Sequence, residues 1–274
     1  MRLGGPILEG YENAKEWAQL VIKANYTATL CPVDASASDL MIASYEYEAK
    51  KNNITIAEVG VWNNPITSDY EKRNQAIEFC KKQLALSEQI GALCCVNIAG
   101  SRGEKWDGPH QDNFNKDAFA LIVDTVREII DSVKPSRTFY TLEPMPWIFP
   151  DSPKSYLELI KAIDRKAFAV HLDPVNMITS PKLYLNNSKF LQECFRLLGP
   201  YIKSCHAKDI VMDDVFVTHI SEAAPGHGIL DYKTYITEIN KLNPDIPLII
   251  EHLTTKEEYE SATHYIQSVA ASLT

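Results

Sequence analysis

The sequence predicts an α/β protein that folds as a single (β/α)8 TIM barrel. Short apolar or β-branched runs alternate with helical patterns along the whole chain, and this alternation is typical of a parallel sheet. Eight such strand–helix units follow one another in 274 residues without a linker-like change in composition. This number of units in this length favours a closed barrel over an open doubly wound sheet. We therefore expect one domain over residues 1–274.

The predicted strands are short runs of apolar and β-branched residues that end at turn or polar residues. They are expected at residues 2–5, 26–30, 54–59, 93–98, 138–143, 168–173, 202–207 and 247–251.

The predicted helices have apolar residues at helical spacing. Two helix starts are also marked by capping boxes, Ser68 with Glu71 and Thr254 with Glu257. The helices are expected at residues 12–24, 39–51, 68–90, 113–133, 152–163, 189–198, 232–242 and 256–273.

Long connections rich in Gly, Pro, Trp and His follow the third to seventh strands. In a barrel, these connections lie on the C-terminal face, where active sites are built. No glycine-rich nucleotide-binding motif or dedicated phosphate-binding loop is visible. The connections are residues 60–67, 99–112, 144–151, 174–187 and 208–230.

Composition narrows the classes of partner. The formal net charge of -9 argues against non-specific binding to nucleic acid or to anionic membranes, which needs a basic surface. No apolar run approaches the roughly 20 residues of a membrane span, and the first residues lack the apolar core of a signal peptide. The six cysteines form no CxxC pair, which indicates reduced thiols. We expect a soluble, cytoplasmic protein.

Four potential metal ligands stand at the ends of consecutive predicted strands. Glu143, Asp173, His206 and Glu251 end the fifth to eighth strands, and a barrel would place them in one arc at its mouth. A single residue of this kind is usually structural, but four on consecutive strands favour a metal site. Three oxygens and one nitrogen suit manganese, magnesium, cobalt or zinc without selecting among them. His171 lies one layer below Asp173 on the same side, where it would support a ligand.

The motifs that carry these residues resemble, in order, those of the fifth to eighth strands of the xylose isomerase-like barrel superfamily. The resemblance covers essentially the whole chain. The motifs are LEP at 142–144, HLDP at 171–174, CHAKD at 205–209, PGHGILDY at 225–232 and IIEH at 249–252.

The resemblance implies that Glu143, Asp173, His206 and Glu251 bind one divalent metal ion. Manganese is the expected ion, with magnesium, cobalt and zinc as alternatives. In the ketose epimerase branch the first and last glutamates also shuttle the proton, so the resemblance gives Glu143 and Glu251 a catalytic role. Asn176 replaces a histidine that many members have three residues after the aspartate. The extra histidines of the DNA-repair endonuclease branch are not evident.

Further pocket candidates follow other strand ends. Glu58 could bind a sugar hydroxyl or act as an accessory acid or base, and Asn97 could bind substrate. Structural roles are the alternative for both. Lys208 could polarise a substrate carbonyl, or it could pair with the adjacent Asp209. His252 is given the ordinary role of a hydrogen-bonded surface side chain.

Aromatic and histidine residues in the long loops are candidates for substrate contact. Trp106 could stack on a sugar ring, with His110 as an acid or base in the same loop; packing of a lid is the alternative for both. His227, between two glycines, could bind a ligand or substrate, or be a loop residue. Trp62 and Trp147 would form apolar pocket walls.

Three function classes remain open from the sequence. The first is a metal-dependent sugar isomerase or epimerase that acts through an enediolate. The second is a lyase that uses the same enolate: a dehydratase, or the catalytic subunit that cleaves 3-keto-glycosides, including C-glycosides with an aromatic aglycone. The third is a non-catalytic sugar-binding barrel. The expected partner is a small sugar or glycoside, without nucleic acid or membrane, in a homo-oligomer that could include a small partner subunit.

Overall fold

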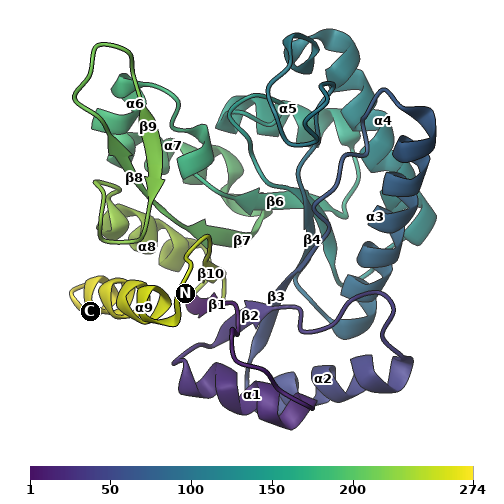
Figure 1. The fold of residues 1–274 in the computed structure, drawn as a ribbon, viewed down its shortest axis with the longest axis vertical. Helices are drawn as coiled ribbons and strands as arrows, with labels where there is room; N and C mark the ends of the chain where they lie inside the picture. The colour runs from purple at the N-terminus through teal and green to yellow at the C-terminus, as the bar shows by residue number, and fades with distance from the viewer. Residues whose placement is uncertain (274) are drawn as a thin grey trace.

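The computed structural model describes residues 1–273; Thr274, the last residue of the predicted domain, lies outside them. Eight parallel strands close into a barrel in the order β1-β10-β7-β6-β5-β4-β3-β2 (Figure 1), which confirms the predicted TIM barrel. The barrel strands are β1 Arg2–Gly5, β2 Ala28–Leu30, β3 Thr55–Gly60, β4 Cys94–Asn97, β5 Phe139–Leu142, β6 Phe168–Leu172, β7 Ile202–Ala207 and β10 Pro247–Ile250.

A ring of helices surrounds the strands, one after each barrel strand (Figure 1). Their apolar faces pack on the barrel, so the main core lies between the two layers. None of the helices within residues 1–273 is both long and apolar enough to cross a lipid bilayer. The ring consists of α1 Ala14–Lys23, α2 Asp39–Lys51, α3 Tyr70–Ile90, α4 Lys116–Val133, α5 Pro153–Ile163, α7 Asn187–Leu198, α8 Tyr232–Leu242 and α9 Lys256–Ala271.

Neither predicted capping box forms, and in both cases the N-cap lies one residue later than predicted. Asp69, not Ser68, caps α3, because its carboxylate accepts from two backbone N–H groups at once. The box that opens α9 pairs Thr255 with Glu258, whose side chain accepts from the Thr255 backbone N–H.

Three predicted segments contain short elements that the sequence did not indicate. The predicted helix 113–133 begins later, at α4, after a 3-10 turn at Gln111–Phe114. The predicted loop 174–187 holds a 3-10 turn, Val175–Met177, and the short helix α6, Pro181–Leu185. The predicted loop 208–230 forms an antiparallel hairpin of β8, Asp209–Met212, and β9, Ile220–Ala223. Elements of three to five residues are too short to show a periodic pattern.

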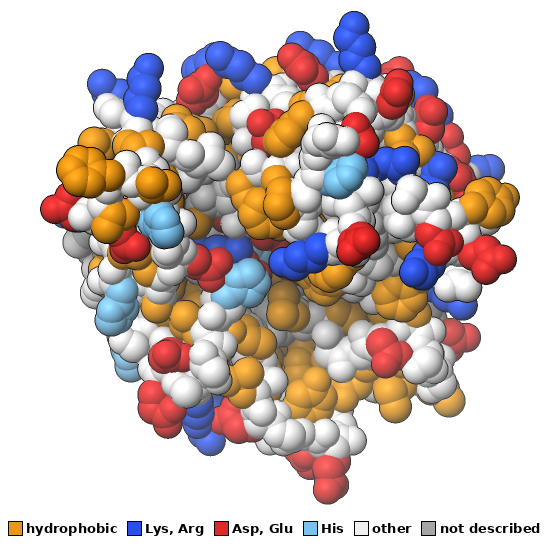
Figure 2. Space-filling view, turned by 45° about the horizontal axis from the view of Figure 1, so that its top comes forward, with side chains coloured by type: hydrophobic (Ala, Val, Ile, Leu, Met, Phe, Trp, Pro, Cys, Tyr) orange, Lys and Arg blue, Asp and Glu red, His pale blue; other side chains and the backbone are white. Residues whose placement is uncertain are grey.

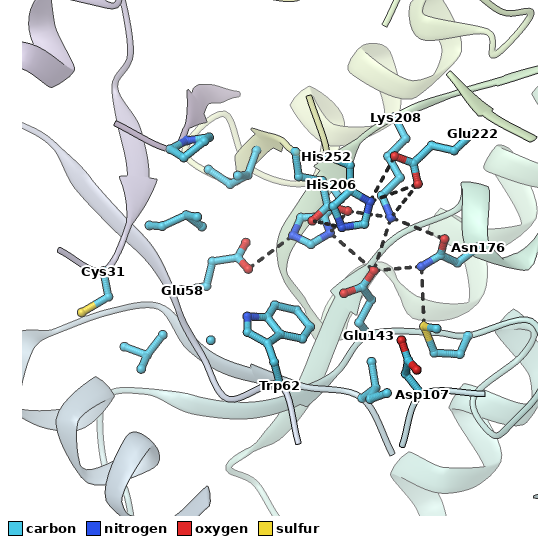
Figure 3. A pocket seen from close by; sticks show the side chains of 18 of the residues that line it. Cys31, Glu58, Trp62, Asp107, Glu143, Asn176, His206, Lys208, Glu222 and His252 are labelled. Carbon is cyan, nitrogen blue, oxygen red and sulfur yellow. Dashed lines mark hydrogen bonds and ion pairs between the residues drawn. The ribbon is translucent and has the colours of Figure 1, made fainter. Parts of the chain in front are cut away.

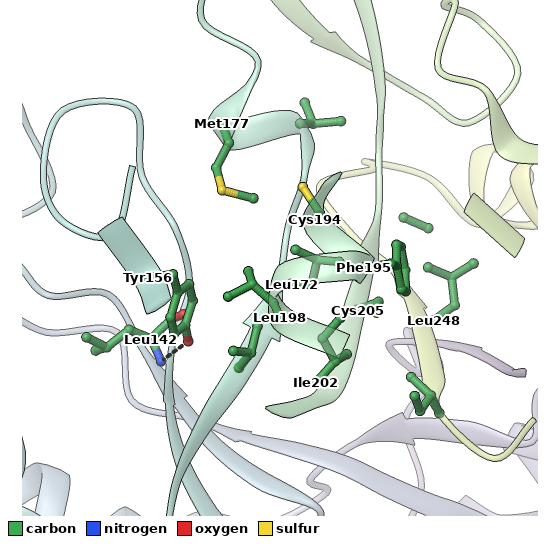
Figure 4. Close-up of a cluster of buried hydrophobic side chains, with 14 of the residues drawn as sticks. Leu142, Tyr156, Leu172, Met177, Cys194, Phe195, Leu198, Ile202, Cys205 and Leu248 are labelled. Atoms are coloured by element: carbon green, nitrogen blue, oxygen red, sulfur yellow. Dashed lines mark hydrogen bonds between the residues drawn. The ribbon is translucent and has the colours of Figure 1, made fainter. Parts of the chain in front are cut away.

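Buried hydroxyl groups connect the helix layer to the barrel. Figure 4 shows Tyr156 of α5 among apolar side chains that include Leu142 and Leu172. Its hydroxyl donates to the Leu142 carbonyl at 2.6 Å and lies 3.1 Å from the Ala169 carbonyl. Tyr235 of α8 likewise donates to the His206 carbonyl at 2.9 Å. These bonds satisfy backbone carbonyl groups near the C-terminal ends of two strands, β5 and β7.

Gly4 is required by the close packing of the barrel interior. A Cβ at this position would lie 2.1 Å from the Ala28 carbonyl oxygen, which is fixed in β2. We expect Gly4→Ala to lower the free energy of unfolding by about 1–3 kcal/mol. Gly10→Ala is the matched control, because a Cβ there would meet nothing within 4 Å. Urea unfolding of both variants checks the expectation, and equal stability would contradict it.

Candidate active site

Four side chains from four consecutive strands meet at the C-terminal mouth of the barrel. Glu143 and Asp173 directly follow β5 and β6, His206 lies near the end of β7, and Glu251 directly follows β10. One ligand atom from each residue lies within 4.8 Å of the others. The parallel register explains this convergence, since Ile249 of β10 pairs with His206 of β7 and brings the two strand ends level.

The facing atoms of this group lack hydrogen-bond partners. Asp173 Oδ2, His206 Nδ1 and Glu251 Oε1 are buried without a hydrogen bond, and each makes an ion-pair contact with another residue of the mouth. The other oxygen of Asp173 accepts from the backbone N–H groups of Val175 and Asn176, which turns Oδ2 toward the centre. His206 Nδ1 lies 2.8 Å from Glu251 Oε1 and 3.8 Å from Asp173 Oδ2. Buried polar atoms that converge in this way suit a bound cation.

Lys208 supplies positive charge to the same group. Its Nζ lies 2.6 Å from Glu251 Oε1 and 2.8 Å from Asp173 Oδ2, and it is 3.6 Å from Glu143 Oε1. Burial opposes the charge of this ammonium, but the nearby carboxylates raise its pKa well above the ordinary value. Figure 3 shows the side chain pointing into the cluster.

Asp209 does not pair with Lys208, so that alternative from the sequence is wrong. Its carboxylate accepts from the backbone N–H groups of Ile210, Gly226 and Leu230. Asp209 therefore fixes the segment after the hairpin and leaves Lys208 to the carboxylates of the mouth.

The two glutamates of the group have opposite pKa shifts. Burial and the charge of Glu251 raise the pKa of Glu143. Burial would also raise the pKa of Glu251, but the positive charges of His206 and Lys208 lower it to about 2. The pKa of His206 is raised well above its ordinary value, because three nearby carboxylates outweigh its burial. The group therefore concentrates negative charge beside the positive charges of His206 and Lys208.

A second layer lies beneath the four side chains. Glu58, within β3, accepts from Ser204 Oγ at 2.7 Å, and its other oxygen is 3.4 Å from His206 Nε2. The ring of His171 stands edge-on to that of His206 at 4.0 Å, and its Nδ1 is 3.7 Å from Glu58 Oε1. Burial and the charge of His206 lower the pKa of His171 to about 4. These contacts place His171 under the mouth, beside His206.

Glu143, His206 and Glu251 line a cavity of about 840 Å³, and Asp173, fully buried, lies next to them. Figure 2 shows this face of the molecule hollowed, with hydrophobic side chains within the hollow and charged and histidine side chains at its rim. Among the residues predicted from the sequence, Glu58, Trp106 and Lys208 line the cavity together with Trp62 and Trp147.

Three predicted substrate-binding residues lie outside this cavity. Asn97 is fully buried, and its amide donates to Asn63 Oδ1 at 3.0 Å. His110 lines a neighbouring cavity of about 850 Å³ and caps the 3-10 turn before α4. His227 lines a smaller cavity against α9. The structure does not bring these three together with the charged group.

Three residues at the mouth have roles that the sequence did not assign. Glu222 of β9 lies 3.1 Å from His252 Nδ1 and 3.4 Å from Lys208 Nζ. The hydrogen bond to Glu222 raises the pKa of His252. Asn176 donates from Nδ2 to Glu143 Oε1 at 2.8 Å and so orients that carboxylate. The departure from the family histidine was the only sequence signal for Asn176, and Glu222 had none because the hairpin was not predicted.

The chain matches one protein family and many solved structures. The family model described as Xylose isomerase-like TIM barrel matches residues 17–270. No curated protein matches the chain. A xylose isomerase-like barrel protein from Mycobacterium smegmatis in complex with magnesium aligns with a TM-score of 0.70 and 16% identity, covering 100% of this chain and 98% of that one.

Two further structures show the range of reactions on this fold. The 3-keto-D-glucoside 4-epimerase from E. coli aligns with a TM-score of 0.69 and 13% identity. A probable 3-DHS dehydratase from Bacillus anthracis aligns with a TM-score of 0.70 and 16% identity. Each alignment covers 98% of this chain and 99% of the other. The family match confirms the resemblance found in the strand-end motifs: the chain belongs to the xylose isomerase-like TIM barrel family.

Proposed function

We propose that this protein is a divalent-metal-dependent isomerase or epimerase that acts through an enediolate on a carbonyl sugar or sugar derivative. The observation that carries the proposal is the convergence of Glu143, Asp173, His206 and Glu251 beside a cavity that three of them line. Their three carboxylates and one imidazole fit a divalent cation. Asp173 Oδ2, His206 Nδ1 and Glu251 Oε1 face the same point without hydrogen bonds, in ion-pair contact with Lys208 or with each other.

The four residues would hold the metal, and the two glutamates among them would also carry the proton. When bound, the metal would polarise a carbonyl and lower the pKa of the neighbouring C–H. Glu143 or Glu251 would take that proton, and the other would return it. Return to the opposite face of the same carbon gives an epimer, and return to the neighbouring carbon gives an aldose–ketose isomer. Manganese is our expected ion.

Lys208 and Asn176 would assist this proton transfer. The Lys208 ammonium lies among the carboxylates and could donate a hydrogen bond to an oxygen on which negative charge develops. Asn176 holds Glu143 Oε1 through an amide N–H, which keeps the carboxylate in one orientation. The loops around the cavity would limit access of water to the carbanion-like intermediate.

The second candidate is a lyase that starts from the same enolate and expels a group from the adjacent carbon. The cavity of about 840 Å³ favours it, because this space is larger than a monosaccharide needs and leaves room for a leaving group. A dehydratase would release water, and a glycoside-cleaving subunit would release an aglycone. Both retain the first proton transfer, so they share the residues assigned above.

Metal analysis and a solvent-exchange assay test the proposal together. Purified protein is analysed for divalent metals and incubated in D2O with a panel of ketoses, aldoses and their keto-glycosides. Deuterium uptake at a carbon next to the carbonyl supports an isomerase or epimerase, and release of water or an aglycone supports a lyase. If no divalent metal is bound, and manganese, magnesium, cobalt and zinc restore nothing, the proposal is wrong.

A further inference from the structure

Glu58, His171 and His206 form a second group of potential metal ligands, which lies beneath the mouth of the barrel. One ligand atom from each residue lies within 4.8 Å of the other two, and each of the three residues is at most 1% exposed. Of these three, only His206 belongs to the proposed metal site of the mouth. Two histidines and one glutamate are a common ligand set for zinc, in which they leave a fourth position open.

The barrel strands bring these side chains together across the interior. His171 of β6 pairs in register with Ser204 of β7, and His206 lies two residues further along β7 on the same face as Ser204. Glu58 comes from β3, which is not a neighbour of β7 in the barrel. Its Oε1 accepts a hydrogen bond from the Ser204 hydroxyl at 2.7 Å. Ser204 therefore holds the carboxylate across the barrel and leaves Oε2 beside His206.

The ring of His171 lacks the partners that a buried imidazole needs. Both of its nitrogens are buried without a hydrogen bond to any part of residues 1–273. Nδ1 lies 3.7 Å from Glu58 Oε1, which is beyond hydrogen-bond distance. A neutral imidazole has one N–H donor and one acceptor nitrogen, so a buried ring without partners is costly. A cation bound by one nitrogen would remove part of this cost.

The separation of Glu58 and His206 suits a shared cation better than a direct hydrogen bond. Glu58 Oε2 and His206 Nε2 are 3.4 Å apart (Figure 3). Hydrogen bonds between nitrogen and oxygen are usually about 2.7–3.2 Å long. Two ligands of a tetrahedral zinc ion, each about 2.0–2.1 Å from the metal, lie about 3.3–3.4 Å apart. The two atoms therefore have the spacing of zinc ligands.

The two groups share His206 but use different nitrogens of its ring. Nδ1 lies among the three carboxylates of the proposed metal site, whereas Nε2 faces Glu58. Glu58 and His206 both line the main cavity, so an ion can reach them from the mouth. A histidine bound at both nitrogens carries no ring proton, and the protons that it loses pass to the buffer as the ions bind.

We infer that Glu58, His171 and His206 form a second cation site that takes zinc, and that His206 bridges it to the ion of the mouth. Two nitrogens and one oxygen favour zinc, whereas the three oxygens and one nitrogen of the mouth favour manganese or magnesium. With three protein ligands, the zinc ion keeps a position for water or a substrate oxygen. The inference rests on the proposed function only for the ion at Nδ1.

Metal counting tests the inference without turnover. Untagged protein is freed of metal with a chelator, loaded with manganese and given one equivalent of zinc, and the ions that remain after gel filtration are counted by mass spectrometry. We expect about one manganese and about one zinc per chain, because the two ligand sets differ. Loss of manganese as zinc binds, or retention of no zinc, overturns the inference, because a water molecule or a direct hydrogen bond would then satisfy the lower group.

Variants locate the zinc on the lower group. Glu58→Gln keeps the shape of the side chain and His171→Leu removes both ring nitrogens. Each should lower the zinc affinity of the manganese-loaded protein at least about a hundredfold and leave manganese affinity within about threefold, as calorimetry measures. If Glu58 only orients His206, Glu58→Gln would instead lower manganese affinity about ten- to a hundredfold, and this result contradicts the inference.

His264→Gln, at an exposed histidine of α9, is the control for zinc bound at the surface and should change neither affinity. Thermal unfolding shows whether each variant folds, and Glu58→Gln decides the test if His171→Leu does not. The electron paramagnetic resonance spectrum of bound manganese then reports the bridge. Zinc should change this spectrum in the unmodified protein and not in Glu58→Gln, because the ions share His206. An unchanged spectrum at full zinc binding overturns the bridge.

The solvent-exchange assay separates this inference from the proposed function. Zinc that binds beside manganese, in a protein that exchanges no substrate proton, supports the second cation site and removes the isomerase proposal. Exchange that manganese alone supports, in a protein that binds no zinc beside it, supports the isomerase and removes the second site.

Discussion

Glu143→Gln is expected to lower the rate of substrate deuterium exchange at least about a thousandfold, while the protein stays folded. The amide has nearly the shape of the carboxylate, and its oxygen can still accept the hydrogen bond from Asn176 Nδ2. The amide cannot take a proton from carbon, however, and it binds a metal ion more weakly than the carboxylate does. The rate is measured in D2O at saturating manganese, and calorimetry of manganese binding separates loss of the base from loss of the metal.

Glu158→Gln is the matched control for this variant. Glu158 lies on the exposed side of α5, the helix that follows the same strand, so the substitution removes the same charge outside the mouth. Its exchange rate should equal that of the unmodified protein. Should Glu143→Gln also exchange at the original rate, Glu143 would not be the base of the proposed proton transfer.

Lys208→Met is expected to lower the free energy of unfolding by about 3–5 kcal/mol in the presence of a chelator. The ammonium touches Asp173 and Glu251 and lies within 4 Å of Glu143 and Glu222, and it is 2% exposed. Without it, buried carboxylates would face one another with only His206 to balance them. Excess manganese should restore most of the lost stability, because a ligand that binds only the folded state stabilises it.

Urea unfolding with EDTA and with manganese measures both halves of this expectation. Lys241→Met is the control, since Lys241 pairs with Glu238 at the surface of α8 and its side chain is 62% exposed. An exposed pair of this kind contributes little to stability. If Lys208→Met is as stable as Lys241→Met in EDTA, the carboxylates of the mouth need no cation, and the assignment of the metal site loses its electrostatic support.

The barrel and the charged group could be predicted because both depend on local pattern and strand order. Each strand is a short apolar run, and Glu143, Asp173 and Glu251 come directly after such runs. Closure of the barrel then fixes which ends are neighbours. The place of His206 could also be predicted, because the fold class puts its strand, β7, between β6 and β10.

Asn97 shows what strand order alone cannot predict. Asn97 ends β4 as Glu143 follows β5, and we expected both side chains in the pocket. In the sheet register, Asn97 pairs with Leu142, the residue before Glu143. The Leu142 side chain packs against the helix layer (Figure 4). Asn97 therefore lies on the outer side of the barrel, where its amide approaches Cys80 of α3. A difference of one residue in register changes the face, and the register depends on long-range pairing.

Glu222 shows the same limit for loops. Its approach to Lys208 and His252 depends on a hairpin whose two strands are separated by a turn without periodic pattern. No local signal marks a residue whose position is set by contacts with distant parts of the chain.

The loops after β3 and β4, residues 61–69 and 98–110, carry Trp62 and Trp106 but none of the four proposed metal ligands. Exchange of these loops between relatives would change which molecules enter while the strands that carry the ligands stay untouched. Evolution, or a protein engineer, could therefore alter the choice of substrate and the chemistry of this barrel in separate steps, since the two depend on different segments of the chain.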